Sequence, residues 1–332
     1  MLVESVPNYS EGRRLGVVDR LAEAVRATPA AYLLDRTSDA SHNRSVLTIA
    51  GEAWAVEQAL ESTIAIAIEA IDMEVHTGEH PRIGAVDVIP FVPLGTTTLD
   101  DCIGLARAFG QRIANRFELP VYLYARAAFH PDRVRLADVR RGGYEGLRET
   151  IHEPGREPDF GPARVHPRAG AVAVGARPFL IAWNINLEST DLDLAKRIAR
   201  TVRESGGGLP AVQANGFMIE ELECAQVSMN LLDFETTSMW RVWDEVGALA
   251  RESGIELRES ELIGLAPLAA FDDVARHAGV GGDLPVERRF AAAASYLRLR
   301  DARPEMALEL RLAAEMGSTG ATRSAPGSTR PR

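Results

Sequence analysis

The same order of strand and helix patterns occurs twice along the chain, and this repeat restricts the fold more than any other feature. Residues 2–92 read in the order strand, helix, strand, strand, helix, strand, because alternating or apolar runs are separated by stretches of helical periodicity. The same order is legible between about residues 178 and 265. This order is the signature of a split βαβ unit. The sequence therefore predicts an α/β (α+β) protein with two similar lobes that face one another.

The expected boundaries follow from where each periodicity begins and ends. In the first lobe we expect strands at 2–6, 31–34, 45–50 and 85–92 and helices ending near Arg26 and over 53–71, then a helix at 99–116 and a strand at 121–124. In the second lobe we expect strands at 179–186, 211–219, 225–232 and 255–263 and helices to about Glu204, capped within Ser189-Thr190-Asp191, and over 236–252. Residues 142–175, dense in Pro, Gly and His, are predicted to form a long loop or lobe boundary, and 316–332 a disordered tail.

Composition narrows the class of function. The chain has 332 residues, which suggests two medium domains, and its formal net charge of -10 argues against a binder of nucleic acid or of anionic membranes. No window approaches the length and apolarity of a membrane span, so we expect a cytoplasmic protein. The two cysteines, Cys102 and Cys224, lie in regular segments and are predicted to be small buried hydrophobic residues. Any anionic ligand must therefore be held by individual arginines.

The richest cluster of chemically active residues is His76-Thr77-Gly78-Glu79-His80-Pro81-Arg82. Histidine can accept and return a proton near neutral pH, so proton transfer is the first hypothesis. The spacing H-x-x-E-H also occurs in zinc peptidases, where both histidines share one helix face. Here Gly78 weakens a helix and Pro81 disfavours the helical conformation at His80, so we expect a loop. A second candidate site is the polar run 35–44, which is richer in Asp, Ser and Asn than a plain hairpin needs.

Six strings in order carry a resemblance to a known family: Val6 to Gly12, His42 to Val46, His76 to Ile89, Pro158 to Pro162, Gly175 to Arg177 and Asn184 to Leu187. Together they resemble the glutamate formimidoyltransferase family, from the first residues to about residue 300. The resemblance implies two ferredoxin-like βαββαβ subdomains, at 1–177 and 178–304, with the active site in the cleft between them. Residues 305–332 would be a C-terminal helix remnant and a disordered tail. It also implies a homodimer that contacts mainly through the N-terminal subdomains.

The resemblance further implies a reaction. The formimino group of N-formimino-L-glutamate would move to N5 of tetrahydrofolate, the co-substrate, in histidine degradation, and no metal is expected. The catalytic histidine of the family falls on His80. The folate-binding segment falls on Gly161, Pro162, Ala163, Arg164, Val165, His166, Pro167, Arg168, Ala169 and Gly170.

The chain departs from the animal members of this family in three ways. It ends without a cyclodeaminase domain, so we expect a separate protein to release ammonia from the product. The acids before Asn43-Arg44 are Asp35 and Asp39, which are spaced differently from the animal pattern. The string His166-Pro167-Arg168 is closer to bacterial single-domain members.

Roles for individual residues follow from the chemistry of the two substrates. His80 would take the proton from N5 and return it to the departing glutamate nitrogen, a role typically worth ~10²–10⁴ in rate. Asp39 either orients His80, binds the cationic amidinium, or forms a turn as an Asx residue. Guanidinium groups bind carboxylates in bidentate fashion, and we favour Arg44, next to Asn43, and Arg82 as substrate-binding.

Other polar residues fall within the same strings. Arg164, Arg168 and Arg177 are further candidates to bind carboxylates, and for Arg164 a solvated surface position is an equal alternative. Asn184 and Asn186 alternate with Ile185 and so share one strand face, from which their amides could contact the pterin or the glutamate; the polar face of an edge strand is the alternative.

Two other classes of function stay open. A folate-binding paralogue would keep the cleft without catalysis, although the intact Glu79-His80-Pro81 argues against it. A zinc hydrolase would use His76, Glu79 and His80 and would need a further ligand. Within the enzyme hypothesis the transferred group could be formyl instead of formimino, because the donors differ by one heteroatom. No nucleic-acid partner is expected.

Overall fold

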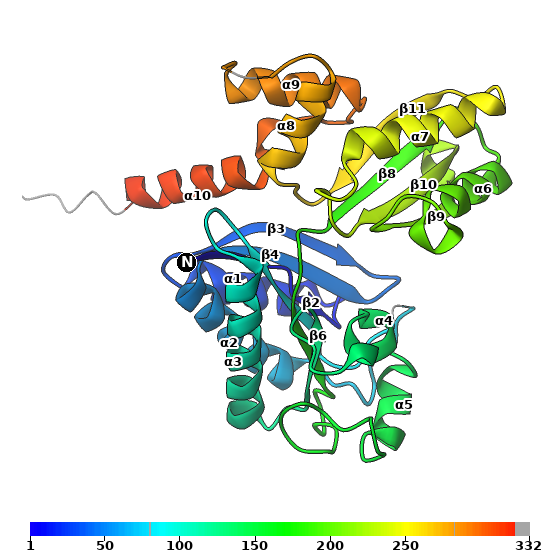
Figure 1. Cartoon of the computed structure of the whole chain (residues 1–332). Coiled ribbons are helices and arrows are strands. Elements are labelled where there is room, and N and C mark those ends of the chain that lie inside the picture. The colour runs from blue at the N-terminus through cyan, green and yellow to red at the C-terminus, as the bar shows by residue number, and fades with distance from the viewer. Residues whose placement is uncertain (80, 282, 323–332) are drawn as a thin grey trace, which may run out of the picture. The chain divides into compact units, whose positions relative to one another are not determined.

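The computed structural model describes residues 1–79, 81–281 and 283–322. By its internal contacts the chain divides into two compact units, Met1–Pro178 and Phe179–Arg332 (Figure 1). Each unit contains its own β-sheet. The mixed α/β architecture with two sheets confirms the predicted fold class.

The sheet of the first unit contains a ferredoxin-like half. Strands β1 (Leu2–Ser5) and β2 (Asn8–Tyr9) both pair antiparallel with β4 (Arg44–Glu52) on one side and with β5 (Val86–Pro93) on the other. They act as one strand interrupted at Val6-Pro7, since proline has no amide hydrogen to donate to the ladder. Strand β3 (Ala31–Asp39) pairs with β4 at the edge. The first strand thus lies between the third and the fourth, as a split βαβ unit requires.

One face of this sheet is covered by three helices, α1 (Leu15–Arg26), α2 (Ala53–Ala70) and α3 (Leu99–Phe117) (Figure 1). Their buried residues recur at helical spacing and pack on the apolar side of β1, β4 and β5. Helix α3 begins at a capping box between Thr98 and Asp101. The rings of Phe91 on β5 and Phe109 on α3 meet edge to face at 5.4 Å between centroids.

The prediction of a long loop over 142–175 is wrong at both ends. Helix α5 (Gly143–Thr150) begins this stretch, and strand β7 (Val172–Ala176) ends it. Strand β7 lies parallel between β5 and β6 (Val121–Ala125), so the sheet extends beyond its ferredoxin-like half. Buried residues of α5 and of α4 (Leu136–Val139) pack with the second face of β5, β6 and β7.

The polar run 35–44, predicted as a loop, belongs mostly to a hairpin. Strand β3 continues to Asp39 and β4 starts at Arg44, in register with each other, so that only residues 40–43 form the turn. The polar side chains of an edge strand can face solvent while its backbone pairs with the neighbouring strand, which is why the polar pattern concealed the strand. The second candidate site of the sequence is therefore a tight hairpin turn.

The second unit repeats the framework in its simplest form. Its sheet has the order β11 (Leu257–Ile263), β8 (Ile181–Leu187), β10 (Cys224–Leu231) and β9 (Val212–Ile219), all antiparallel. Helix α6 (Leu192–Val202) is capped by Asp191, whose carboxylate accepts from the Leu194 amide at 2.9 Å, as predicted. Helix α7 (Met239–Glu252) begins three residues later than expected. The ring of the fully buried Trp183 packs against the ring of Trp243 on α7, with 6.2 Å between the ring centroids.

The second unit continues beyond the repeat with α8 (Leu268–His277), α9 (Val286–Tyr296) and α10 (Leu308–Thr322). Short 3-10 turns occur in the two units at Pro131–Arg133, Glu204–Gly206, Glu220–Leu222 and Pro304–Met306. Helix α10 enters the predicted disordered tail as far as Thr322, which corrects that prediction for 316–322; the remainder, 323–332, lies outside the described residues.

Two predictions from composition can be checked against the fold. Cys102 and Cys224 are buried free cysteines, as predicted, and burial raises the pKa of the Cys102 thiol to about 12. Among the residues described by the structure, no helix has both the length and the apolar character that crossing a bilayer requires.

Candidate active site

The histidine loop, residues 71–85 between α2 and β5, meets the β3–β4 turn at Asn43. The buried Asn43 accepts from the Gly12 amide through Oδ1 at 2.9 Å and donates through Nδ2 to the Thr77 carbonyl at 2.9 Å. Its backbone has φ +48°, a left-handed conformation that asparagine tolerates better than most residues. Gly78 approaches the same turn so closely that a Cβ there would lie 2.3 Å from the His42 carbonyl oxygen. Three segments of the first unit therefore meet at one amide side chain.

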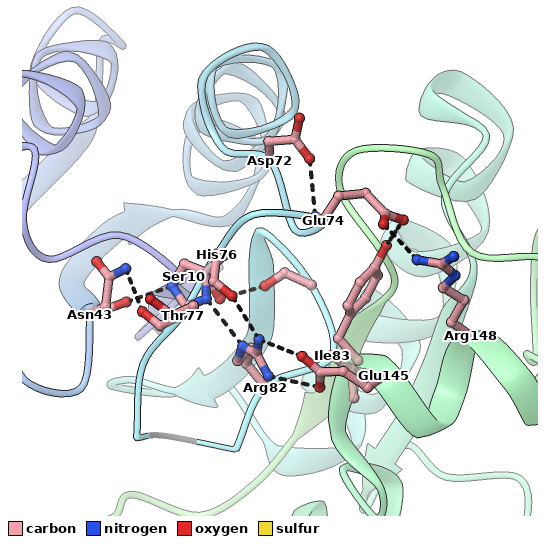
Figure 2. Close-up of polar contacts among 12 residues, drawn as sticks. Ser10, Asn43, Asp72, Glu74, His76, Thr77, Arg82, Ile83, Glu145 and Arg148 are labelled. Atoms are coloured by element: carbon pink, nitrogen blue, oxygen red, sulfur yellow. Dashed lines mark hydrogen bonds and ion pairs between the residues drawn. The ribbon is translucent and has the colours of Figure 1, made fainter.

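The imidazole of His76 is held at both nitrogens. Nε2 lies 3.1 Å from the Asn43 carbonyl oxygen, to which it must donate, and Nδ1 accepts from Arg82 Nε at 3.1 Å (Figure 2). This pattern describes a neutral ring with its proton on Nε2. Burial lowers the pKa of His76, with a further lowering contribution from the neighbouring Arg82, which agrees with the neutral form. His76 thus supports the loop and has no free nitrogen for a metal ion.

The guanidinium of Arg82 is bonded within the chain. It donates to both carboxylate oxygens of Glu145 on α5, at 3.0 and 2.8 Å, and to the His76 carbonyl at 3.0 Å (Figure 2). The hydrogen bonds from Arg82 lower the pKa of Glu145. At the start of the loop, Glu74 accepts from Tyr144 and Arg148 of the same helix, at 2.7 and 2.5 Å. A cavity of about 560 Å³ lies between the loop and α5.

Asp39 closes the hairpin turn. Its carboxylate accepts from the His42 amide at 2.9 Å and lies 2.6 Å from His42 Nδ1. The amide hydrogen bond is the main cause of a lowered pKa at Asp39. These are the contacts of a turn-forming Asx residue, and they make Asp39 the orienting partner of His42. The predicted catalytic role of Asp39 stays a prediction.

The predicted folate segment, 161–170, lies beside the histidine loop. The Met73 amide donates to the Arg168 carbonyl at 2.8 Å, and the Ala85 amide donates to the Ala169 carbonyl at 2.9 Å. Gly84 and Gly170 form an antiparallel bridge, and a Cβ on Gly84 would meet the Ala171 carbonyl oxygen at 1.9 Å. Two strings that are distant in sequence are therefore joined along their backbones.

His166 shapes the end of this segment. Its Nδ1 accepts from the amides of Arg168 and Ala169, at 3.2 and 3.0 Å, and its backbone exchanges hydrogen bonds with Gly170. Burial lowers the pKa of His166, which favours the neutral ring that this acceptor role requires. The other members of the predicted segment, Gly161, Pro162, Ala163, Arg164 and Val165, lie on the stretch between the Phe160–Val121 bridge and this turn.

The arginines predicted to bind carboxylates differ in their surroundings. Arg44 lines a small pocket with His42, Asn43, His76 and Arg82, and burial lowers its pKa, as does the nearby Arg140. The space in this pocket, about 10 Å³, holds at most one water molecule. Arg164 and Arg168 are exposed, and Arg177 is half-buried with its guanidinium on the Pro178 carbonyl.

Asn184 and Asn186 lie in the second unit, on the sheet face opposite α6 and α7. Asn186 donates to Glu259 at 3.2 Å and accepts from Gln226 at 2.8 Å, while Asn184 donates to Glu261 at 3.4 Å. Arg300 forms ion pairs with both glutamates. The two asparagines share one face, as the alternation in the sequence predicts, within a polar network.

His80, the predicted catalytic residue, lies outside the described residues. Its sequence neighbours Glu79 and Pro81 belong to a non-helical stretch, as expected for this loop. Within 1–79, 81–281 and 283–322, no cluster of three or more His, Cys, Asp or Glu is placed to hold a metal ion.

Known proteins resemble this chain over most of its length. A family profile described as the formiminotransferase domain, N-terminal subdomain, matches residues 2–177, and one described as the formiminotransferase domain matches 182–279. Glutamate formimidoyltransferase of Streptococcus pyogenes serotype M1 is 43% identical over 83% of this chain and 92% of its own length. The protein of the same name from Thermoplasma acidophilum is 43% identical over 83% and 91%.

The chain belongs to the formiminotransferase family.

Formimidoyltransferase-cyclodeaminase of Rattus norvegicus is 45% identical over 82% of this chain, which spans 52% of that protein.

The structure also brings to the histidine loop several polar residues that no sequence motif marked. These are Glu74, Asp87, Arg140, Tyr144, Glu145 and Arg148, which bond to the loop or to each other. Three of them lie on α5, and the others are spread over the loop, β5 and the end of α4, so no motif in the sequence connects them to the loop.

Proposed function

We propose that this chain is a glutamate formimidoyltransferase, which transfers the formimino group of N-formimino-L-glutamate to N5 of tetrahydrofolate and releases L-glutamate. The observation that carries this proposal is the backbone pairing of the histidine loop with the predicted folate segment, at Met73 with Arg168 and at Ala85 with Ala169. A transferase of this kind needs an acid-base group and the acceptor at the same place. Membership of the family supports the same activity.

The reaction forms one bond and breaks one. N5 of tetrahydrofolate attacks the amidine carbon, and the bond from this carbon to the glutamate nitrogen then breaks. In our proposal His80 takes the proton from N5 and returns it to the glutamate nitrogen, so that the enzyme ends unchanged. A near-neutral pKa suits a group that must act as both base and acid in one turnover.

The described residues around His80 have supporting roles in this mechanism. His76 is neutral and hydrogen-bonded at both ring nitrogens, so it supports the loop and leaves proton transfer to His80. The guanidinium of Arg82 donates hydrogen bonds to Glu145 and His76. Arg168, at the turn of the folate segment, is exposed and donates to the Glu69 carbonyl at 3.2 Å, and it is our candidate to bind the glutamate tail of the folate.

Other parts of the proposal rest on the family resemblance alone. We propose a cytoplasmic homodimer, with Asn43, Arg44, Asn184 and Asn186 as further substrate contacts. A separate cyclodeaminase would process 5-formiminotetrahydrofolate.

A turnover assay tests the proposal. The purified protein is given tetrahydrofolate with either N-formimino-L-glutamate or N-formyl-L-glutamate, and product formation is followed with and without a chelator. We expect formimino transfer that survives chelation and falls by ~10²–10⁴ in His80→Ala. The matched control is His152→Ala, since His152 is exposed and has no hydrogen-bond partner among the described residues.

Each outcome has a distinct meaning. Tetrahydrofolate binding without transfer from either donor would overturn the enzyme claim and leave a folate-binding paralogue. Hydrolysis of the donor without tetrahydrofolate, lost with the chelator and restored by zinc, would support the hydrolase alternative instead. Transfer from the formyl donor alone would correct the substrate while the role of His80 stands.

A further inference from the structure

Helix α5 contacts the histidine loop on both sides of its central residues. Glu145 binds Arg82 through two hydrogen bonds near the end of the loop, and Arg148 binds Glu74 near its start (Figure 2). Tyr144 also donates to Glu74, at 2.7 Å. Residues 75–81 lie between these two points. One short helix therefore restrains both ends of the segment that contains the histidines.

The helix itself is well anchored. Tyr144 is 2% exposed, and Leu147 is buried with residues of β5 and β6, so the apolar side of α5 is fixed to the sheet. Tyr144 and Arg148 are one helical turn apart and share a face, which lets both reach the carboxylate of Glu74. Burial raises the pKa of Tyr144 to about 12, so its hydroxyl stays protonated and can donate.

Arg82 transmits the restraint to His76. Two of its nitrogens face Glu145, and its remaining donors reach His76 at Nδ1 and at the carbonyl, at 3.1 and 3.0 Å. The side chain of Arg82 is 12% exposed, whereas that of Glu145 is 65% exposed. Loss of the Glu145 carboxylate would leave a largely buried guanidinium with its partners on one side only, and would release the ring that it orients.

We propose that Glu145 is a positioning residue for formimino transfer, acting through Arg82 to fix the orientation of the histidine loop. This inference rests on the proposed function and assigns Arg82 to the loop instead of to a substrate carboxylate. The cavity of about 560 Å³ between α5 and the loop is within the size range of small-ligand sites, and His76 and Thr77 form part of its wall. The position of the loop thus sets the shape of that cavity.

The test compares Glu145→Gln with Glu145→Asp and with Glu153→Gln. Glu153 is exposed, and its carboxylate has no hydrogen-bond or ion-pair partner among the described residues, so it is a matched control for removal of one charge. We expect Glu145→Gln to lower kcat by about 10-fold to 100-fold. The KM for both substrates should stay within about 2-fold, because in this proposal Glu145, although it lines the cavity, acts on Arg82 and not on a substrate. Glu145→Asp, which keeps a carboxylate, should recover part of kcat, and Glu153→Gln should match the wild type.

A double-mutant cycle separates positioning from direct binding. If Glu145 acts through Arg82, then Glu145→Gln with Arg82→Lys should lower kcat no further than Arg82→Lys alone. A raised KM for one substrate in Arg82→Lys, together with wild-type kcat in Glu145→Gln, would show that Arg82 binds that substrate and would overturn the proposal.

Hydrogen–deuterium exchange decides the question even if the protein has no transferase activity. Amides of residues 74–79, 82 and 83 should exchange faster in Glu145→Gln than in the wild type or Glu153→Gln, while amides of α2 are unchanged. Unchanged exchange in the loop would overturn the positioning role. A wild type without transfer whose loop nevertheless loosens in Glu145→Gln would contradict the proposed function and leave the contact itself established.

Discussion

The two units share one βαββαβ framework, and within this framework one connection differs in length. In the first unit the second helix of the repeat, α2, is joined to the fourth strand, β5, by residues 71–85, which contain the histidine loop. In the second unit the equivalent connection, between α7 and β11, is only 253–256. The four strands of the repeat keep the same order in both sheets, and β7 and β6 extend only the first. Packing therefore determines the framework, and the length of one loop determines where chemistry can be added.

The two units also differ at the turn before the third strand of the repeat. The turn at 40–43 ends in Asn43 and the turn at 220–223 ends in Glu223, and both residues have φ +48° directly before the third strand of their unit. Asn43 bonds to two other segments, whereas the Glu223 side chain is exposed and has no hydrogen-bond partner among the described residues. The same backbone geometry therefore occurs at a residue that connects three segments in the first unit and at a simple turn in the second.

The largest effect should come from the framework. Trp183→Ala removes a fully buried indole from the second sheet, and Phe91→Ala removes a fully buried ring from the first. Each should cost about 3–5 kcal/mol of unfolding free energy. Denaturant unfolding followed by circular dichroism measures both. A loss below about 1 kcal/mol in either variant would contradict the assignment of that ring to a packed core.

Glycine substitutions in the two connections should separate activity from stability. Gly78→Ala places a Cβ against the His42 carbonyl and should displace the loop, lowering kcat/KM by about 100-fold. Gly254 has φ +71° with open space around it, so Gly254→Ala should cost about 1–2 kcal/mol of stability and leave kcat/KM unchanged. Steady-state kinetics and thermal unfolding of both variants check this. Wild-type activity in Gly78→Ala would break the comparison.

The two turns should respond to glycine with opposite signs. Asn43→Gly relieves the positive φ but removes one buried and one partly buried hydrogen bond, and should destabilise by about 1–3 kcal/mol. Glu223→Gly relieves the same strain and removes no bond, and should stabilise by up to about 1 kcal/mol. Equal shifts in unfolding free energy would show that Asn43 does not join its three segments.

The smallest effect concerns pH. His76 and His166 both have folded pKa values lowered by burial, below an unfolded value of about 6.5. The unfolded chain binds more protons in that window, so stability is complete above pH about 6.5 and falls as the pH drops towards the folded values. Melting temperatures between pH 5 and 7.5 should decline towards acid in the wild type and decline less in His76→Gln and His166→Gln. Melting-temperature profiles that run parallel in the wild type and both variants would contradict a contribution of these histidines to the pH dependence.

The framework could be predicted well from the sequence because local hydrophobic periodicity marks most helices and strands of each lobe. It missed β7, since Val172–Ala176 is short, buried on both faces and therefore without alternation. It also shortened β3, whose polar end from Asp35 is held by pairing with β4, a contact that local patterns cannot reveal. Both errors arise where tertiary pairing overrides local preference.

The candidate site was predictable only where its residues cluster in sequence. His76, His80 and Arg82 stand within one short string, and Asn43-Arg44 in another. Glu145 and Tyr144 lie on a helix much further along the chain, in a segment without any marked motif, so only the fold connects them to the loop. Asp39 was proposed to orient His80 or to bind the amidinium, with a turn-forming Asx residue as the alternative, and its observed partner is His42.

The pairing of residues 83–85 with 169–171 has a consequence for synthesis of the protein. The histidine loop emerges from the ribosome early, but its backbone partners at Ala169 and Ala171 are made much later, after β6 and α5. Closing so long a segment costs conformational entropy before the contact is gained. The first lobe can thus form its helices and hairpin during translation. The loop reaches its final conformation only when Ala171 has been added. A nascent chain stopped before that residue should therefore have the framework of the lobe but not the final conformation of the histidine loop.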